Sequence, residues 1–287
     1  MPVLSPHARA AIRARLERTQ YGRGLLAIRR RASAIHRRAR SIRGQAGFLR
    51  QTLAGEEQWP GMFEAFNGQQ ARRRVVQALI EQFEPDGFIE TGTFLASTTR
   101  FFAGNNVPVY SAEINRLHWL LARLRLGWRS GVRLVYGDSR DMLDRLAAER
   151  PFRRPLAYLD AHWGEDHPLR DELARLCQHW SEVLIVVDDF AVDDDRGYSH
   201  DAGLSLAEVR LPASVAVAVP ATPSSSETGA RRGALYLAHG ENAKLAVREV
   251  MRRGLLREPA SGRDEAPLPP TPGPGRGSVQ RASDRSA

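Results

Sequence analysis

Aspartate residues stand directly after two apolar segments of this 287-residue chain. The sequence YLDAHW runs from apolar residues into Asp160, and VVDDF runs into Asp188 and Asp189. A buried strand end is better served by a neutral side chain, so these acids indicate a site. Carboxylates from neighbouring strands are hard oxygen ligands that hold Mg²⁺ or another divalent ion, which could acidify a bound hydroxyl. The alternative is that Asp188 and Asp189 only cap the following loop and bind an arginine.

A histidine follows the first of these acids. His162 lies two residues after Asp160, and a neutral imidazole can take a proton from a hydroxyl near neutral pH. We therefore take His162 and Asp160 as the candidate catalytic residues. The alternative for His162 is ordinary structural hydrogen bonding.

A glycine turn follows an earlier apolar segment, in FIETGTFLASTTRFF. Gly92 permits a tight turn and the close approach of a ligand to the backbone, and a helix is expected to begin near Ser97. Glu113 ends the next apolar segment about twenty residues later, where an acidic side chain can accept hydrogen bonds from both ribose hydroxyls of an adenosine. The turn and the acid together indicate an adenosine site.

A third apolar segment is followed by YGDSR. Its Asp138 could accept a hydrogen bond from the exocyclic amine of an adenine, and Ser139 could cap the next helix. The alternative is that Asp138 or Ser139 is only a helix N-cap.

The segments that carry these residues alternate between strand-like and helical patterns, which is typical of a parallel sheet with helices on both faces. In such sheets, ligands bind beyond the carboxyl ends of the strands. Two later β-rich runs, joined by a turn-rich linker without a helical pattern, predict a terminal antiparallel hairpin. We expect strands at 87–91, 107–113, 132–136, 156–160, 183–188, 214–220 and 234–238, and helices at 70–83, 97–102, 116–126, 140–150 and 169–180.

Charge and composition set off both ends of the chain. The formal net charge is +9, yet the first 50 residues carry thirteen Arg and one Glu, or +12, so the remainder sums to −3. Residues 1–54 are expected to form an Arg-rich helical extension, and residues 55–256 the catalytic domain. Residues 257–287, rich in Pro and Gly, are expected to be a disordered tail.

The basic extension could recruit phosphates through charge alone. However, Lys244 is the only lysine, so the arginines could reflect codon usage, and we do not expect a nucleic-acid partner. We expect the extension to pack on the core or to join two copies of the chain in a homo-oligomer.

Nothing in the sequence predicts export or a membrane span. No run approaches the ~20 apolar residues that cross a bilayer, and the charged N-terminus is unlike a signal peptide. A single cysteine, Cys177, cannot form an internal disulfide, as is usual in a reducing compartment. We expect a cytoplasmic protein.

The ordered motifs IETGTFLASTT, VYSAEIN, YGDSRDML, YLDAHW and VVDDF resemble those of class I S-adenosylmethionine-dependent methyltransferases. More narrowly, they resemble the macrocin O-methyltransferase group and its uncharacterised relatives. The resemblance covers about residues 66–238, including FNGQQARRR before the first strand. It implies a Rossmann-like α/β three-layer sandwich with a seven-stranded sheet whose last strand is antiparallel. It also implies methyl transfer from S-adenosylmethionine to a hydroxyl of a small molecule, such as a sugar or a secondary metabolite, with help from Mg²⁺.

The resemblance also implies the roles of individual residues in cofactor binding. Glu90, Gly92 and Thr93 would line the methionine end of the cofactor. Glu113 would hold the ribose, and Asp138 with Ser139 would border the adenine. The metal ligands would be Asp160, Asp188 and Asp189.

This chain departs from the family in two places. The family's turn has glycines where this chain has Phe94 and Ala96, so the turn is bulkier and depends more on Thr91, Thr93 and Ser97. After Asp160, macrocin-type enzymes have another acidic residue, whereas this chain has Ala161-His162-Trp163.

Three other functions compete with methyl transfer. A nicotinamide-dependent oxidoreductase would need the G-x-G-x-x-G turn that seats a pyrophosphate, and this turn is absent. A degenerate cofactor-binding scaffold would use its basic N-terminus to bind an anionic partner. A hydroxylase-like activity, suggested by the family's neighbours, would place a metal at the same aspartates.

Overall fold

The computed structural model describes residues 63–127, 129–161, 168–192, 209, 211–223, 227 and 233–259. The extension expected at residues 1–54, the candidate base His162, and the tail from residue 260 onward lie outside these ranges. Within the described part, no helix is long and apolar enough to cross a membrane.

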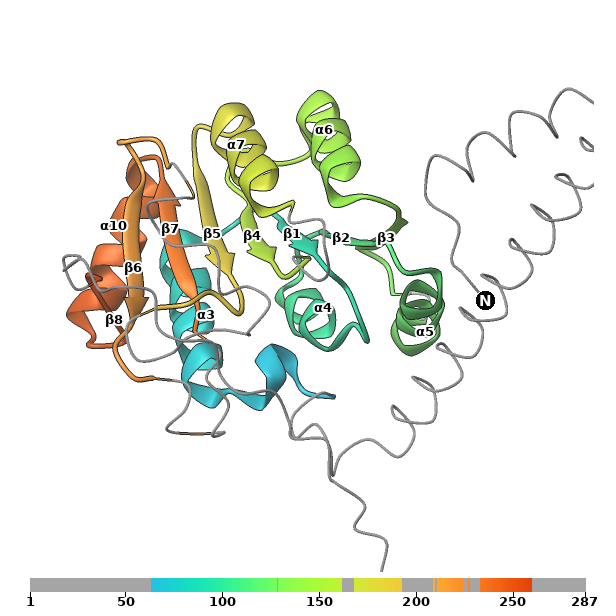
Figure 1. Cartoon of the computed structure of the whole chain (residues 1–287), viewed down its shortest axis with the longest axis horizontal. Helices are drawn as coiled ribbons and strands as arrows, with labels where there is room; N and C mark the ends of the chain where they lie inside the picture. Colours follow the sequence, from blue (N-terminus) through green and yellow to red (C-terminus); the bar gives the residue numbers. More distant parts are fainter. Residues whose placement is uncertain are drawn as a thin grey trace, which may run out of the picture. The chain divides into compact units, whose positions relative to one another are not determined.

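One sheet forms the centre of the domain, with its strands in the order β3-β2-β1-β4-β5-β7-β6-β8. The first five strands pair in parallel, and β7 lies antiparallel between β5 and β6 (Figure 1). The strands are β1 Phe88–Thr91, β2 Val109–Glu113, β3 Val132–Tyr136, β4 Leu156–Leu159, β5 Val183–Val187, β6 Ala216–Pro220, β7 Leu235–His239 and β8 Leu256–Arg257.

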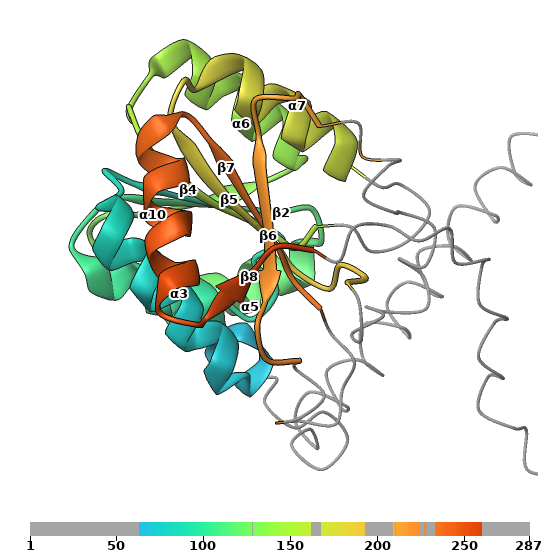
Figure 2. The same ribbon diagram turned by 90° about the vertical axis from the view of Figure 1, so that its left-hand side faces the viewer.

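Helices cover both faces of the sheet. α6 and α7 pack on one face, whereas α3, α4, α5 and α10 pack on the other (Figure 2). The helices are η1 Ala65–Gly68, α3 Gln70–Phe83, α4 Ser97–Phe102, η2 Ala103–Asn105, α5 Arg116–Leu126, α6 Ser139–Glu149, α7 Leu169–His179 and α10 Glu241–Arg252.

The strand and helix periods explain this layering. The buried positions of α3, among them Val75, Val76, Leu79 and Phe83, recur every three or four residues and form one apolar face. β5 is buried at every position, as expected for a parallel strand covered on both sides. Every strand and helix expected between residues 70 and 238 is present, with its ends within two residues of the expected ones.

The expectation of seven strands is wrong, because the sheet has eight. After α10 the chain turns at Gly254, whose φ is +72°. Leu256 and Arg257 then return along β6 as the antiparallel strand β8. β6 and β7 do pair antiparallel, but β7 is inserted next to β5, so the pair is not a simple hairpin added to the edge of the sheet.

Candidate functional site

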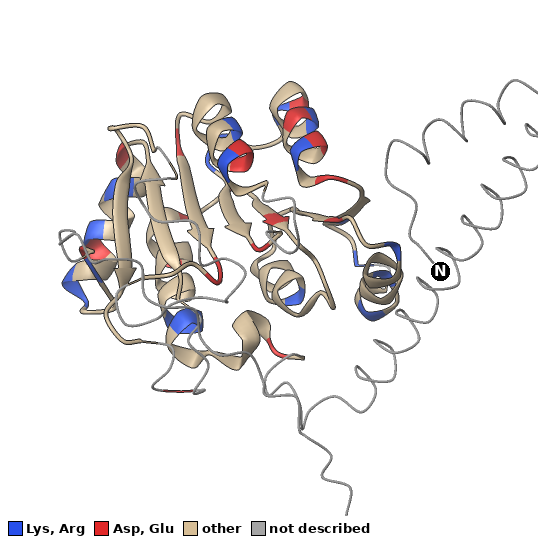
Figure 3. Cartoon of the chain, viewed as in Figure 1, with Lys and Arg blue, Asp and Glu red and all other residues tan. Residues whose placement is uncertain are grey.

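The strand order reverses between β1 and β4, which is where open α/β sheets bind ligands beyond their strand ends. Acidic residues, drawn in red, stand at several of these ends (Figure 3). Gly92 follows β1 with a φ of +81°, and a Cβ on it would lie 2.2 Å from the carbonyl oxygen of Asp160. The Asp160 N–H donates to the Thr91 carbonyl at 2.9 Å. Glycine is therefore required where the ends of the parallel strands β1 and β4 lie side by side.

The turn after β1 also has a left-handed backbone at two positions that are not glycine. Phe94 and Ala96 have φ values of 47° and 58°, in the left-handed region that costs a non-glycine residue roughly 1–2 kcal/mol. The methyltransferases that the sequence motifs resemble have further glycines at these two positions. The Phe94 ring lies edge-on against the His118 imidazole, with centroids 5.0 Å apart. The turn is thus strained in its backbone and fixed by a side-chain contact.

Glu113, at the end of β2, is tied to this turn. One of its carboxylate oxygens accepts the Phe94 N–H at 2.9 Å, and the other accepts the Asn115 N–H at 2.7 Å. Burial raises the pKa of Glu113 and lowers the pKa of the neighbouring His118, whose Nδ1 is 3.9 Å from the carboxylate. The acid expected to hold a ribose therefore borders the glycine turn.

Glu90 lies beneath the same turn and is 2% exposed. One of its oxygens accepts hydrogen bonds from the Thr99 and Ser111 hydroxyls, and the Ser111 hydroxyl is 2.6 Å from that of Thr93. Burial raises the pKa of Glu90 to about 7, against the effect of the two hydroxyls. Glu90 thus supports the turn from the interior of the domain.

Asp138 is the N-cap of α6, as the simpler interpretation of this position predicted. Its carboxylate accepts the backbone N–H of Arg140 at 2.8 Å and is paired with the Arg140 guanidinium, whose Nη2 is 2.6 Å away. Hydrogen bonding to Arg140 holds the pKa of Asp138 below its usual value. The expectation that Ser139 caps this helix is wrong, because Asp138 supplies the capping oxygen. Ser139 is the buried first residue of the helix. The N-cap of α4 is Ala96, and Ser97 follows as the first helical residue.

Glu172 of α7 is a buried carboxyl that sequence reasoning missed. Burial raises its pKa to about 7, and the hydroxyls of Ser139 and Thr91, which face it, act in the opposite direction. The signal was its position, because it shares the buried face of α7 with Leu169, Leu173 and Leu176. Its carboxyl group reaches the underside of the candidate site.

The end of β5 is occupied by a buried ion pair. Asp188 is 1% exposed and pairs with Nη1 of Arg72 from α3. The Tyr158 hydroxyl donates to its other oxygen, and the Asp189 N–H donates to Oδ1 at 2.7 Å. The alternative that Asp188 binds an arginine is confirmed. Arg72 belongs to the segment FNGQQARRR, in which no local pattern indicates its partner.

These contacts do not fit the metal site expected from Asp160, Asp188 and Asp189. Among the residues that the structure describes, no group of three His, Cys, Asp or Glu side chains is arranged to hold a metal ion. The carboxylate of Asp188 already accepts from three donors, so a metal ion there would compete with the positive charge of the Arg72 guanidinium.

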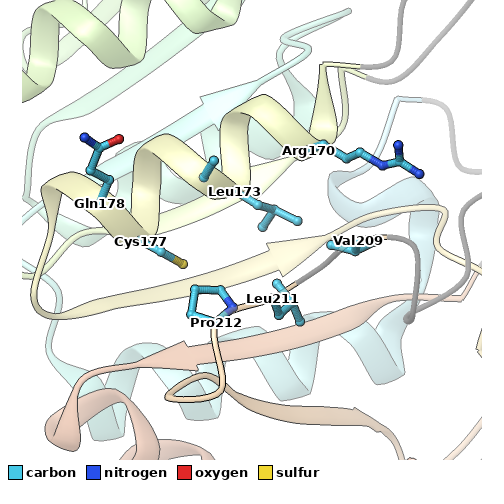
Figure 4. A pocket seen from close by; sticks show the side chains of 8 residues that line it. Arg170, Leu173, Cys177, Gln178, Val209, Leu211 and Pro212 are labelled. Atoms are coloured by element: carbon cyan, nitrogen blue, oxygen red, sulfur yellow. The ribbon is translucent and has the colours of Figure 1, made fainter.

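A cavity of about 290 Å³ lies between α7 and the segment before β6 (Figure 4). Its wall is mainly apolar, and it includes Cys177, whose pKa is raised by burial. The residues that line it are Arg170, Leu173, Ala174, Cys177, Gln178, Val209, Leu211 and Pro212. None of them is a candidate site residue.

No protein-family model matches the chain, and no curated protein sequence matches it. Similar solved structures include an O-methyltransferase from Bacillus cereus in complex with SAH, at 16% identity and a TM-score of 0.45, covering 60% of this chain and 81% of that one. The O-methyltransferase TomG from Streptomyces achromogenes is 18% identical, with a TM-score of 0.45 and coverage of 60% and 80%. The N-methyltransferase NodS from Bradyrhizobium japonicum WM9 is 14% identical, with a TM-score of 0.43 and coverage of 59% and 96%. At this level of similarity, these proteins establish neither a family nor an activity for the chain.

Proposed function

We propose that the chain is an S-adenosylmethionine-dependent methyltransferase that acts on a hydroxyl oxygen of a small molecule. The observation that carries this proposal is the contact between Glu113 and the turn after β1. The Phe94 N–H holds one carboxylate oxygen at 2.9 Å, beside Gly92 and at the point where the strand order reverses. A nucleoside bound there would meet an acid and an open glycine backbone together.

The hydrogen-bonding capacity of Glu113 supports a ribose ligand. The Glu113 carboxylate can accept about four hydrogen bonds, and the backbone N–H groups of Phe94, Ile114 and Asn115 take three of these positions. An acceptor position therefore remains for a ribose hydroxyl. The absence of a G-x-G-x-x-G turn argues against a dinucleotide and favours an adenosyl cofactor without a pyrophosphate.

The same arrangement supports the other proposed cofactor contacts. Thr91, Gly92, Thr93 and Ser97 belong to the turn that would face the methionine end, with Glu90 supporting it from below. Asp138 and Ser139 would border the adenine, and Arg140 would then compete with the adenine amine for Asp138.

Asp160 and His162 are the proposed catalytic residues. The backbone N–H of Asp160 is hydrogen-bonded to the Thr91 carbonyl at the end of β1. The Cα of Asp160 therefore lies beside the proposed cofactor site. His162 lies outside the described residues, two positions further along the chain. In this proposal the pair orients the acceptor hydroxyl and takes its proton as the methyl group moves in line from sulfur to oxygen. The narrower resemblance to the macrocin group supports a sugar or secondary-metabolite acceptor.

Isothermal titration calorimetry with S-adenosylhomocysteine tests the proposal. The full-length protein should bind it, and Glu113→Ala should weaken binding by about 10- to 100-fold, because a hydrogen bond to a charged group is lost. Glu149→Ala, on the exposed side of α6, is the matched control and should bind like the wild type. Glu113→Gln keeps the size of the side chain in case the alanine variant does not fold. A wild type that binds no S-adenosylhomocysteine would refute the proposal.

A further inference from the structure

Three consecutive arginines of α3 have different environments. Arg73 lies over the Phe101 ring at 5.4 Å, and Arg74 is 63% exposed and pairs with Glu227. Arg72, in contrast, is buried and turned toward the sheet. It occupies the same helical face as Val75, Val76 and Leu79, where an apolar residue would be usual. A specific partner must therefore account for the arginine at this position.

That partner is the carboxyl end of β5. Nη1 of Arg72 pairs with Asp188, and the two side chains are 4% and 1% exposed. Nη2 donates to the carbonyl oxygen of Gly233 at 3.2 Å, and the same oxygen accepts the Phe190 N–H at 3.1 Å. One guanidinium thus joins α3, the turn after β5 and the residues that lead into β7.

The Asp188 carboxylate is satisfied by this arrangement. It accepts from Arg72, from the Tyr158 hydroxyl and from the Asp189 N–H. A buried carboxylate is stable only when it is paired and hydrogen-bonded, and removing one partner leaves an uncompensated charge. A divalent ion at the same oxygens would be repelled by the guanidinium and would have to expel it.

We propose that Arg72 is the built-in cation of this site, taking the place that the family resemblance assigns to a divalent metal ion at Asp188. Arg72 is then a positioning residue, because it fixes the turn at Asp188 and Asp189 without touching the acceptor itself. Its bearing on methyl transfer rests on the proposed function, whereas the ion pair and its exclusion of metal do not.

Measurement of metal binding by the full-length protein distinguishes this proposal from a salt bridge with only a structural role. After EDTA treatment, wild-type protein and Asp188→Ala should give the same electron paramagnetic resonance signal of bound ion when they are titrated with Mn²⁺. The melting temperature of the wild type should be the same with EDTA and with millimolar Mg²⁺. Arg72→Ala should lower the melting temperature by about 10 °C and should gain one Mn²⁺ site. This gain should disappear in the double variant Arg72→Ala/Asp188→Ala. Arg74→Ala, which removes an exposed arginine of the same helix, should resemble the wild type in both measurements.

Chemical rescue provides a second test. Millimolar guanidinium should raise the melting temperature of Arg72→Ala, because it can refill the vacated space beside Asp188, and it should not raise that of Arg74→Ala. The proposal is overturned if the wild type binds Mn²⁺ stoichiometrically and Asp188→Ala abolishes this binding, a comparison that needs no Arg72 variant. It is also overturned if Arg72→Ala folds but responds neither to Mn²⁺ nor to guanidinium. Failure of the wild type to bind S-adenosylhomocysteine would refute the proposed function and leave these outcomes unchanged.

Discussion

Gly92 and Asp160 meet where β1 and β4 end, so closely that a Cβ on Gly92 would lie 2.2 Å from the Asp160 carbonyl oxygen. No side-chain rotamer can relieve this contact, because the opposing atom belongs to the backbone. The positive φ of Gly92, +81°, adds a conformational penalty for any other residue.

Gly92→Ala should therefore destabilise the domain by roughly 3 kcal/mol, from the left-handed backbone and the forced displacement of β4 together. Gly104→Ala is the matched control, because a Cβ there has no atom within 4 Å, and it should change stability by less than about 1 kcal/mol. Urea denaturation of the three proteins measures both effects. Equal midpoints for the two variants would show that the strand ends are further apart than described.

The strained turn makes a prediction about the shape of residue 94. Phe94→Gly loses the contact with His118, worth about 1 kcal/mol, and gains about as much from relief of its left-handed backbone. Its stability should stay within about 1 kcal/mol of the wild type. Phe94→Val has no such relief, because a β-branched residue tolerates a positive φ poorly, and it should be the less stable variant by about 2 kcal/mol. Denaturant midpoints that rank valine above glycine would rule out the left-handed conformation at this position.

The buried carboxyl of Glu172 predicts a dependence of stability on pH. Its pKa is about 7 in the folded domain and 4.5 as the ordinary value, so the unfolded chain loses this proton first as the pH rises. Below pH 4.5 the carboxyl is protonated in both the folded and the unfolded state, so its burial does not oppose folding. The free energy of unfolding then falls between pH 4.5 and about 7. A pKa shift of this size corresponds to about 3 kcal/mol in the free energy of unfolding.

Glu172→Gln removes this titration. The stability of the variant relative to the wild type should rise between pH 5 and pH 8, as measured by thermal or urea denaturation at each pH. Glu241→Gln, at an exposed acid of α10, serves as the control and should show no comparable rise. A difference between Glu172→Gln and the wild type that stays constant over this range would mean that Glu172 is ionised in the folded domain.

The last prediction concerns a helix-capping contact between residues that are distant in the sequence. The Glu182 carboxylate, just before β5, accepts the N–H groups of Glu241, Asn242 and Ala243 at the start of α10. The helix has no side-chain cap from its own N-cap residue, Gly240. Glu182→Ala should cost about 1–2 kcal/mol, by loss of the cap and of its favourable charge at the helix N-terminus.

Hydrogen exchange should locate this effect in the first turn of α10. Glu81→Ala removes an acid that is 54% exposed and 3.8 Å from Arg253, and it should change stability by less than about 1 kcal/mol. If both glutamate variants lose the same stability, the contribution of Glu182 is ordinary surface charge.

The sequence predicted the layers of the fold because apolar periodicity is a local signal. The ends of α3, α4, α5 and β3 agree with the expected ones, since turn residues and charges bound those segments. β8 could not be anticipated, because a two-residue strand has no period and exists only through its pairing with β6.

The site was less predictable, because neighbours in space are remote in sequence. Nothing local distinguishes Asp188 as an arginine partner from Asp188 as a metal ligand, and the distinction depends on Arg72, more than a hundred residues earlier. Local capping was also ambiguous between Asp138 and Ser139. A polar residue on an otherwise apolar helix face, as at Arg72 and Glu172, is the sequence signal that indicates a buried polar contact.

The helices α3 and α10 are far apart in the sequence, yet they pack against each other on one face of the sheet (Figure 2). A chain emerging from the ribosome therefore presents the apolar face of α3, with Val76 and Leu79, long before Val247 and Val250 exist to cover it. The nascent domain cannot complete the burial of α3 until α10 has been made, and a chain terminated before Glu241 would leave that face exposed to aggregation. Synthesis of α10 and closure of this side of the core are therefore coupled in this topology.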